Sequence, residues 1–167
     1  DDFYGKESFA AVADFFEKDT LGEHAMVGYT LKDVLSEYGS VSRGCGERDA
    51  EGFLKTVVER TTIVKENGVI ISKEKEGDRE LSPDVPTSMN FWGFHPSIFE
   101  FSMKEFLNFL KENHTNIKAE FYIPLIVNEL IRQKAGKVRV ISGSTNWFGV
   151  TYKEDKEEVS QKIKVLI

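Results

Sequence analysis

Cysteine is almost absent from this chain of 167 residues, in which Cys45 is the only one. A single thiol excludes an intramolecular disulfide and a zinc site built from cysteine pairs. The three histidines, His24, His95 and His114, lack the spacing of metal ligands, which argues against a histidine-based metal site. Because no base is evident beside Cys45, we interpret it as a structural thiol, and such sparing use of cysteine favours a reducing, cytoplasmic compartment.

Long apolar runs and a surplus of basic residues are missing too. No segment approaches the roughly 20 apolar residues that a membrane-spanning helix needs, so we expect no membrane partner. The formal charge is −6 at pH 7, whereas general nucleic-acid binders usually carry a basic face. We therefore expect no nucleic-acid partner, although a few local cations or a metal ion can still hold the phosphates of a nucleotide substrate.

The composition is that of a folded domain. Hydrophobic residues make up 40% of the chain and aromatic residues 12%, and a compact domain of this size buries roughly 70% of the surface of its unfolded chain. The length suits a single domain over residues 1–167, and the composition argues against disorder for most of it. The chain begins at Asp1 without an initiator Met or a signal-peptide pattern, so we expect a processed chain or a piece of a longer protein.

Helical and strand patterns alternate along the chain, with no repeat and no internal linker. The spacing of apolar residues predicts helices over residues 6–20, 97–113, 119–134 and 153–166. It predicts strands over residues 24–30, 43–48, 53–61, 63–65, 69–72, 87–94, 137–142 and 147–152, with a short helical or irregular turn at 31–37 and a solvated loop at 73–86. This mixture predicts an α/β sheet covered by helices, with an antiparallel β insertion around residues 39–72.

Asp1 and Asp2 stand at a predicted strand end, followed by two aromatic residues and Gly5. Open α/β folds place their ligand sites at the carboxyl ends of strands. Two adjacent carboxylates there suit Mg²⁺, which takes oxygen ligands and keeps waters for phosphates. An exposed acidic terminus explains the same pair, so the local sequence leaves both interpretations open.

Other segments carry residues suited to holding a sugar or a phosphate. Residues 39–46 are rich in Gly and Ser and suit a ligand cradle with Arg43 as counter-ion, although they lack the spacing of a P-loop. Glu59 suits sugar hydroxyls, Arg60 suits a phosphate, and Asn90 inside an apolar strand needs a partner or a ligand. An ordinary flexible connection and a surface ion pair are the competing explanations for the first two segments.

Six short segments follow one another in a recognisable order: DDFYG, SRGCGERD, VVER, SMNFWGF, KAEFYIP and WFGVT. Together they resemble the C-terminal part of a bacterial sugar-phosphate nucleotidyltransferase. Enzymes of this family join a nucleoside triphosphate to a sugar 1-phosphate and release pyrophosphate. The resemblance covers essentially the whole chain. It implies a partial Rossmann-like, GT-A-like mixed sheet flanked by helices, with the N-terminal nucleotide-binding part absent.

The resemblance implies a magnesium site. Asp1 matches the family's metal-binding Asp, with Asp2 beside it, and Asp1 would serve catalysis through the bound Mg²⁺. The family carries a second metal-binding Asp where this chain has Gly149. Either this change weakens metal binding, or Asp155 or Asp2 substitutes for the missing carboxylate.

The resemblance also implies a sugar site. Gly44 matches a glycine whose backbone meets the sugar, and Glu59 matches the Glu that contacts sugar hydroxyls. Asn90 and Arg43 would complete the substrate-binding set. Arg60 stands where the family carries a Lys that meets the sugar phosphate, so it keeps the charge but changes the geometry.

These assignments predict nucleotidyl transfer from a nucleoside triphosphate to a sugar 1-phosphate, with Mg²⁺ as cofactor. The glycine-rich nucleotide loop of the family is absent, so we expect the isolated chain to be inactive. The alternative is a non-catalytic sugar-phosphate-binding or assembly module. A truncated sheet would also expose an unpaired edge and apolar surface, so we expect a homodimer that covers this edge.

Overall fold

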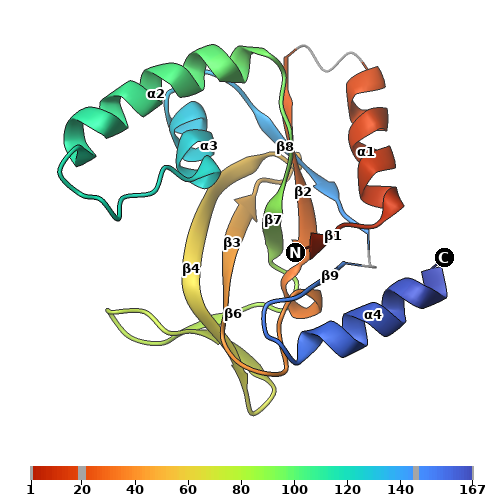
Figure 1. The fold of residues 1–167 in the computed structure, drawn as a ribbon. Coiled ribbons are helices and arrows are strands. Elements are labelled where there is room, and N and C mark those ends of the chain that lie inside the picture. Colours follow the sequence, from red (N-terminus) through yellow and green to blue (C-terminus); the bar gives the residue numbers. More distant parts are fainter. Residues whose placement is uncertain (1, 19–21, 145–146, 167) are drawn as a thin grey trace.

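A mixed seven-stranded sheet forms the centre of the computed structural model, which describes residues 2–18, 22–144 and 147–166 (Figure 1). The strand order is β6-β5-β4-β3-β7-β2-β8, and every neighbouring pair is antiparallel except β2 and β8. The strands are β1 (Asp2–Phe3), β2 (His24–Thr30), β3 (Val41–Arg48), β4 (Leu54–Glu66), β5 (Val69–Ser72), β6 (Arg79–Leu81), β7 (Pro86–Gly93), β8 (Val138–Ser142) and β9 (Phe148–Gly149). The helices are α1 (Lys6–Glu17), the 3-10 turn η1 (Leu31–Asp33), α2 (Ser97–Asn113), α3 (Ile123–Arg132) and α4 (Asp155–Leu166). The chain is therefore a mixed α/β protein, as expected.

The antiparallel segment expected at residues 39–72 is continuous with the main sheet. It forms β3, β4 and β5, and β3 pairs with β7 near the middle of the sheet. β4 is one long strand where the sequence pattern predicted two. The turn after it is Asn67-Gly68, between the segments predicted as strands at 63–65 and 69–72, and both residues have the positive φ that a tight hairpin of this type requires, 52° and 83°.

Three predictions of element bounds were wrong in part. α3 begins at Ile123 instead of residue 119, because Pro124 within a longer helix would clash with the carbonyl four residues earlier. The predicted loop at 73–86 contains the short strand β6, which pairs with β5. The strand expected at 147–152 is only Phe148–Gly149, and the following residues turn into α4.

Two apolar clusters lie on opposite faces of the sheet, because successive strand residues point to opposite sides. The first contains Val27 and receives α1, and the second contains Met26 and receives α2 and α3. Figure 1 shows α1 on one side of the sheet and the pair α2 and α3 on the other. Within the described residues, none of the helices is both long and apolar enough to cross a membrane.

Candidate functional site

A row of small residues crosses the sheet and ends at a carboxylate. In the strand register Gly44 of β3 lies opposite Glu59 of β4 and opposite Ser88 of β7, and Ser88 lies opposite Gly28 of β2. Residues directly opposite one another share a face of the sheet. The row lies on the face covered by α2 and α3, because a Cβ added at Gly46, two residues along from Gly44, would meet side chains of that core.

Gly44 permits a close approach at the centre of this row. A Cβ at this position would lie 3.2 Å from Ser88 Cβ, 3.3 Å from Val57 Cγ2 and 3.5 Å from Glu59 Oε2. A larger residue would therefore crowd both neighbouring strands. The glycine brings the Glu59 carboxylate and the Ser88 side chain next to its own backbone; Gly44 and Ser88 are buried, and Glu59 is the exposed member of the three.

Glu59 has an unusual environment for a carboxylate at the surface. Neighbouring groups partly desolvate it, which raises the pKa of Glu59, while the nearby charge of Arg43 lowers it by less. Among the described residues Glu59 has no hydrogen-bond or ion-pair partner. A partly desolvated carboxylate with free acceptor oxygens is suited to binding a hydroxyl-rich ligand.

Asn90 lies two residues beyond Ser88 on β7, where the pairing with β2 is irregular. Its φ is 58°, a conformation that Asn tolerates better than most residues, and its N–H donates to Ser88 Oγ at 3.1 Å. The expectation of a buried strand position was wrong, since Asn90 is exposed. Its side-chain amide is thus presented to solvent beside the Gly44 row.

Arg43 and Arg60 lie opposite each other, one position away from the pair of Gly44 and Glu59. Their side chains therefore point to the other face of the sheet. Arg43 is buried there, which lowers its pKa, and it donates to the Val34 carbonyl at 2.8 Å.

On that face each of these two arginines already interacts with another side chain. The Arg43 guanidinium lies 5.3 Å from the ring centre of Trp147, so it connects β3 with the segment before β9. Arg60 forms an ion pair with Glu74, and its Nε is buried without a hydrogen-bond partner among the described residues. The structure thus brings Gly44, Glu59 and Ser88 together but does not bring the two arginines to them.

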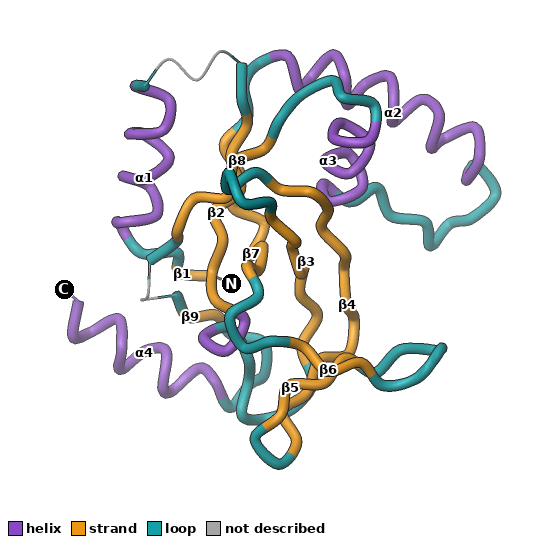
Figure 2. Tube along the Cα trace, turned by 180° about the vertical axis from the view of Figure 1, so that it is seen from behind, coloured by secondary structure: helices purple, strands orange, loops and turns teal. Residues whose placement is uncertain are grey.

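The second group of predicted residues meets where β1 and β9 pair (Figure 2). Asp2 lies opposite Gly149, and the rings of Phe3 and Phe148 stack at 4.9 Å. A Cβ at Gly149 would lie only 2.5 Å from Asp2 Oδ1. The Asp2 carboxylate therefore occupies the space that a side chain at 149 would fill. Asp1 lies outside the described residues.

Of the two candidates to replace a carboxylate at 149, Asp2 is adjacent to the position and Asp155 has another role. Asp155 Oδ2 accepts from the N–H groups of Thr151 at 3.0 Å and Tyr152 at 2.6 Å, and Oδ1 accepts from Ser36 Oγ at 3.4 Å. These bonds hold the turn that leads into α4.

Tyr4 links the β1–β9 junction to the backbone of β7 on the α1 face of the sheet, and the sequence analysis gave it no role. Its hydroxyl has one proton to donate and lies 2.9 Å from the Met89 carbonyl oxygen and 3.3 Å from Asp2 Oδ2. Burial and the nearby carboxylate raise the pKa of Tyr4, which keeps the hydroxyl protonated. Ser88 was missed as well, because only the strand register places it beside Gly44.

The described residues offer few side chains that could hold Mg²⁺. In residues 2–18, 22–144 and 147–166, no group of three or more His, Cys, Asp or Glu side chains is placed to hold a metal ion. Mg²⁺ is commonly held by only one or two carboxylates, with waters and substrate phosphates as the other ligands. The exposed Asp2 carboxylate supplies one such ligand.

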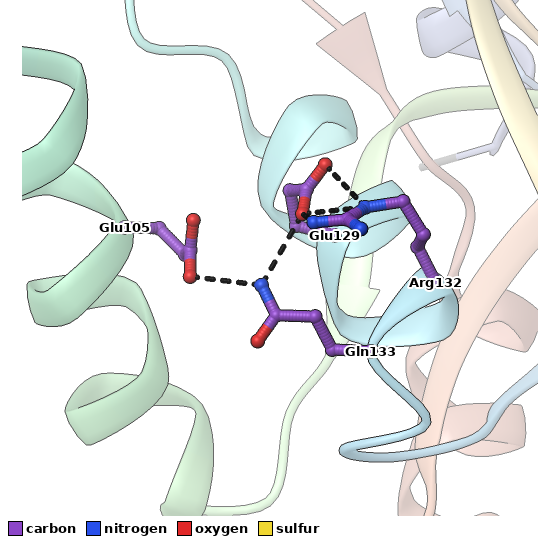
Figure 3. A network of polar contacts seen from close by, with 4 residues as sticks. All are labelled: Glu105, Glu129, Arg132 and Gln133. Atoms are coloured by element: carbon purple, nitrogen blue, oxygen red, sulfur yellow. Dashed lines mark hydrogen bonds and ion pairs between the residues drawn. The ribbon is translucent and has the colours of Figure 1, made fainter.

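The groove between α2 and α3, about 500 Å³ in volume, lies apart from these residues. A polar contact crosses it, as Figure 3 shows: Gln133 Nε2, at the end of α3, donates to Glu105 of α2 at 3.1 Å, and it also donates to Glu129 of α3 at 3.2 Å. Glu129 also pairs with Arg132. None of the predicted site residues lines this groove.

No protein-family model matches this chain, and no curated protein matches it in sequence. The geometry of the site and the resemblance of the six sequence segments are therefore the features that bear on function. The geometry provides a glycine-centred row with a free carboxylate on one face of the sheet. It also provides a second carboxylate at the junction of β1 and β9.

Proposed function

We propose that this chain binds a sugar 1-phosphate and forms the acceptor-binding part of a Rossmann-like, GT-A-like nucleotidyltransferase. The observation that carries the proposal is the pairing of β1 with β9, which places Asp2 opposite Gly149. These are the two segments that the resemblance assigns to a shared metal site, and they come from opposite ends of the chain. The same proposal places the protein in the cytoplasm, because a chain with a single cysteine suits a reducing compartment.

The acceptor would be held at the row centred on Gly44. The free Glu59 carboxylate would accept hydrogen bonds from sugar hydroxyls, and the exposed Asn90 amide would donate and accept, while Gly44, buried between β4 and β7, leaves room for the Glu59 carboxylate. These groups fix the orientation of the sugar phosphate. Orientation is the main contribution that a protein makes to a transfer of this kind.

The reaction would be a direct in-line displacement. An oxygen of the sugar phosphate attacks the α-phosphorus of the nucleoside triphosphate, a new P–O bond forms, and pyrophosphate leaves with the electrons of the bond that breaks. Asp2 lies on the face of the sheet opposite to the Gly44 row and, together with Asp1, would hold Mg²⁺, which would neutralise charge on the phosphates. Arg60 points to the other face of the sheet from Glu59 and is paired with Glu74, so it is not placed to hold the phosphate of an acceptor bound at this row.

A second candidate function is sugar-phosphate binding without catalysis. The observation in its favour is Gly149, which leaves the β1–β9 junction one carboxylate short of the family pattern. Binding by Glu59 and Gly44 does not depend on that carboxylate.

Thermal unfolding with a panel of ligands tests the proposal. The panel contains glucose 1-phosphate, mannose 1-phosphate and N-acetylglucosamine 1-phosphate, with free sugars and inorganic phosphate as controls. A ligand at 100 times its Kd stabilises the native state by about 2.7 kcal/mol, so we expect one sugar 1-phosphate to raise Tm by several degrees.

Variants and a second assay separate the two functions. Glu59→Gln should abolish the Tm shift, whereas Glu105→Gln, on α2 away from the row, should keep it. Pyrophosphate release from a nucleoside triphosphate and the binding sugar phosphate would support transfer, and binding without release would support the second candidate. If no sugar 1-phosphate shifts Tm, both are wrong.

A further inference from the structure

A cavity of about 560 Å³ lies between the end of α3 and the loop that joins β3 to β4. Its lining comes from within residues 49–55 and 131–137, and in the described part of the chain none of the predicted site residues contributes to it. Leu54, which is only 3% exposed, and Ile131 give the cavity an aliphatic floor. Cavities of this size with a mainly apolar lining and a few polar groups are typical of sites for small organic ligands.

Three basic side chains also line the cavity, namely Lys55, Lys134 and Lys137. Among the described residues none of these lysines has an ion-pair partner, although the chain contains 28 Asp and Glu against 22 Lys and Arg. Two acids, Asp49 and Glu51, belong to the lining. Asp49 Oδ1 already accepts from the N–H groups of Glu51 at 2.9 Å and Phe53 at 2.8 Å, so this carboxylate holds the loop. The cavity therefore combines an apolar floor with lysines that are free to bind an anion.

Lys134 adopts a backbone conformation that favours glycine. At the end of α3 the N–H of Ala135 donates to the Leu130 carbonyl and the N–H of Lys134 donates to the Ile131 carbonyl, both at 3.0 Å. This pair of bonds ends a helix with one residue in the left-handed conformation, and that residue is usually Gly. Here it is Lys134, with a φ of 54°. Residues in such sparsely populated conformations cluster at ligand sites, and what this position gains over glycine is an ammonium group at the cavity.

We propose that this cavity binds an acyl carboxylate, the anion of a fatty acid of medium chain length. The carboxylate would accept hydrogen bonds from the lysine ammonium groups, and the acyl chain would lie against Leu54 and Ile131. The Phe53 ring already contacts two cations, since the Arg139 guanidinium lies 4.0 Å and Lys137 Nζ 4.8 Å from its centre. A flexible aliphatic chain therefore suits the floor better than a flat ring, which needs a free aromatic face to stack on. The inference does not depend on the proposed function.

Calorimetric titration of the intact chain with octanoate at neutral pH tests this site. We expect saturable binding that weakens as sodium chloride is added, because salt screens the attraction between the lysines and the carboxylate. Two matched probes separate the parts of the ligand: 1-octanol has the chain without the charge, and acetate has the charge without the chain. Each should bind at least about tenfold more weakly than octanoate. In NMR spectra octanoate should shift mainly the amides of residues 49–55 and 131–137.

Lys134→Gly removes the ammonium group and supplies the residue that the helix end favours, so it should keep or raise Tm while weakening octanoate binding at least about tenfold. Asn67→Gly is the matched control, because Asn67 also has a positive φ, 52°, in the turn between β4 and β5, and it should bind octanoate like the wild type. Lys137→Gln repeats the test at a second lysine, with Tm as the measure of folding.

Three results would overturn the proposal. The first is a wild-type chain that shows no saturable octanoate binding. The second is Lys134→Gly binding octanoate as tightly as the wild type, or 1-octanol binding as tightly as octanoate, since either would show that the cation does not hold the ligand. The third is a set of amide shifts confined to the groove between α2 and α3.

Discussion

A methyl group added at Gly149 tests the close approach of β1 and β9. In Gly149→Ala the new Cβ would lie 2.5 Å from Asp2 Oδ1 and 2.8 Å from Trp147 Cζ2, both shorter than van der Waals contact. The exposed Asp2 carboxylate can turn away, but Trp147 is buried next to the Arg43 guanidinium and cannot. Overpacking costs about 1–3 kcal/mol, and we expect a loss near the middle of that range, about 2 kcal/mol. At about 2–4 °C for each kcal/mol in a domain of this size, Tm falls by about 4–8 °C.

Urea unfolding followed by tryptophan fluorescence measures this loss, with Val150→Ala as the matched control. Val150 is 39% exposed, and we expect its substitution to change the unfolding free energy by less than about 0.5 kcal/mol. Repeating Gly149→Ala in an Asp2→Ala background removes the nearest contact, so the cost should fall by at least about 0.5 kcal/mol. Equal stability of Gly149→Ala and the wild type would refute the reasoning that Asp2 fills the space at position 149.

Glu59 has a raised folded-state pKa, so its ionisation destabilises the fold as the pH rises through that pKa. Urea unfolding between pH 4 and pH 7 should therefore show Glu59→Gln gaining stability over the wild type as the pH increases, and a constant difference would contradict this. Burial raises the pKa of Cys45 to about 11, so a thiol reagent at pH 8 should leave it unmodified in the native state and modify it in urea; rapid modification without urea would contradict its burial. Asn128 Oδ1 accepts from Val57 N–H at 2.9 Å and its Nδ2 donates to the Val57 carbonyl at 2.6 Å. Losing both bonds in Asn128→Ala should cost about 2–3 kcal/mol in calorimetry, and a change below about 0.5 kcal/mol would show that α3 does not hold β4 in this way.

Elements with strong local signals could be predicted from the sequence. β2 and α2 have the predicted bounds, because β2 is a short, mostly apolar run and α2 carries apolar residues at helical spacing. β6 could not be predicted, since three residues with two charges carry no strand pattern and are held by pairing with β5. The start of α3 was predictable in principle from the position of Pro124.

The candidate site also has features that the sequence could predict and features that it could not. Glu59 and Arg60 are consecutive residues of one strand, so the strand prediction alone already implied that they point to opposite faces. That Gly44 lies opposite Glu59 could not be predicted, because β3 contains two irregularities that shift the register against β4. Such shifts are set by packing across the sheet and leave no local pattern in the sequence.

The two helices on one face of the sheet differ in how firmly they are attached. α3 buries Pro124, Ile126, Val127 and Leu130, whereas α2, although longer, buries only Ile98. A helix with so little buried surface can detach and reattach while the sheet stays intact, at a free energy well below that of global unfolding. The amides of α2 should therefore exchange by local opening and report a separate cooperative unit, and the sheet with α3 should be the last part of the molecule to unfold.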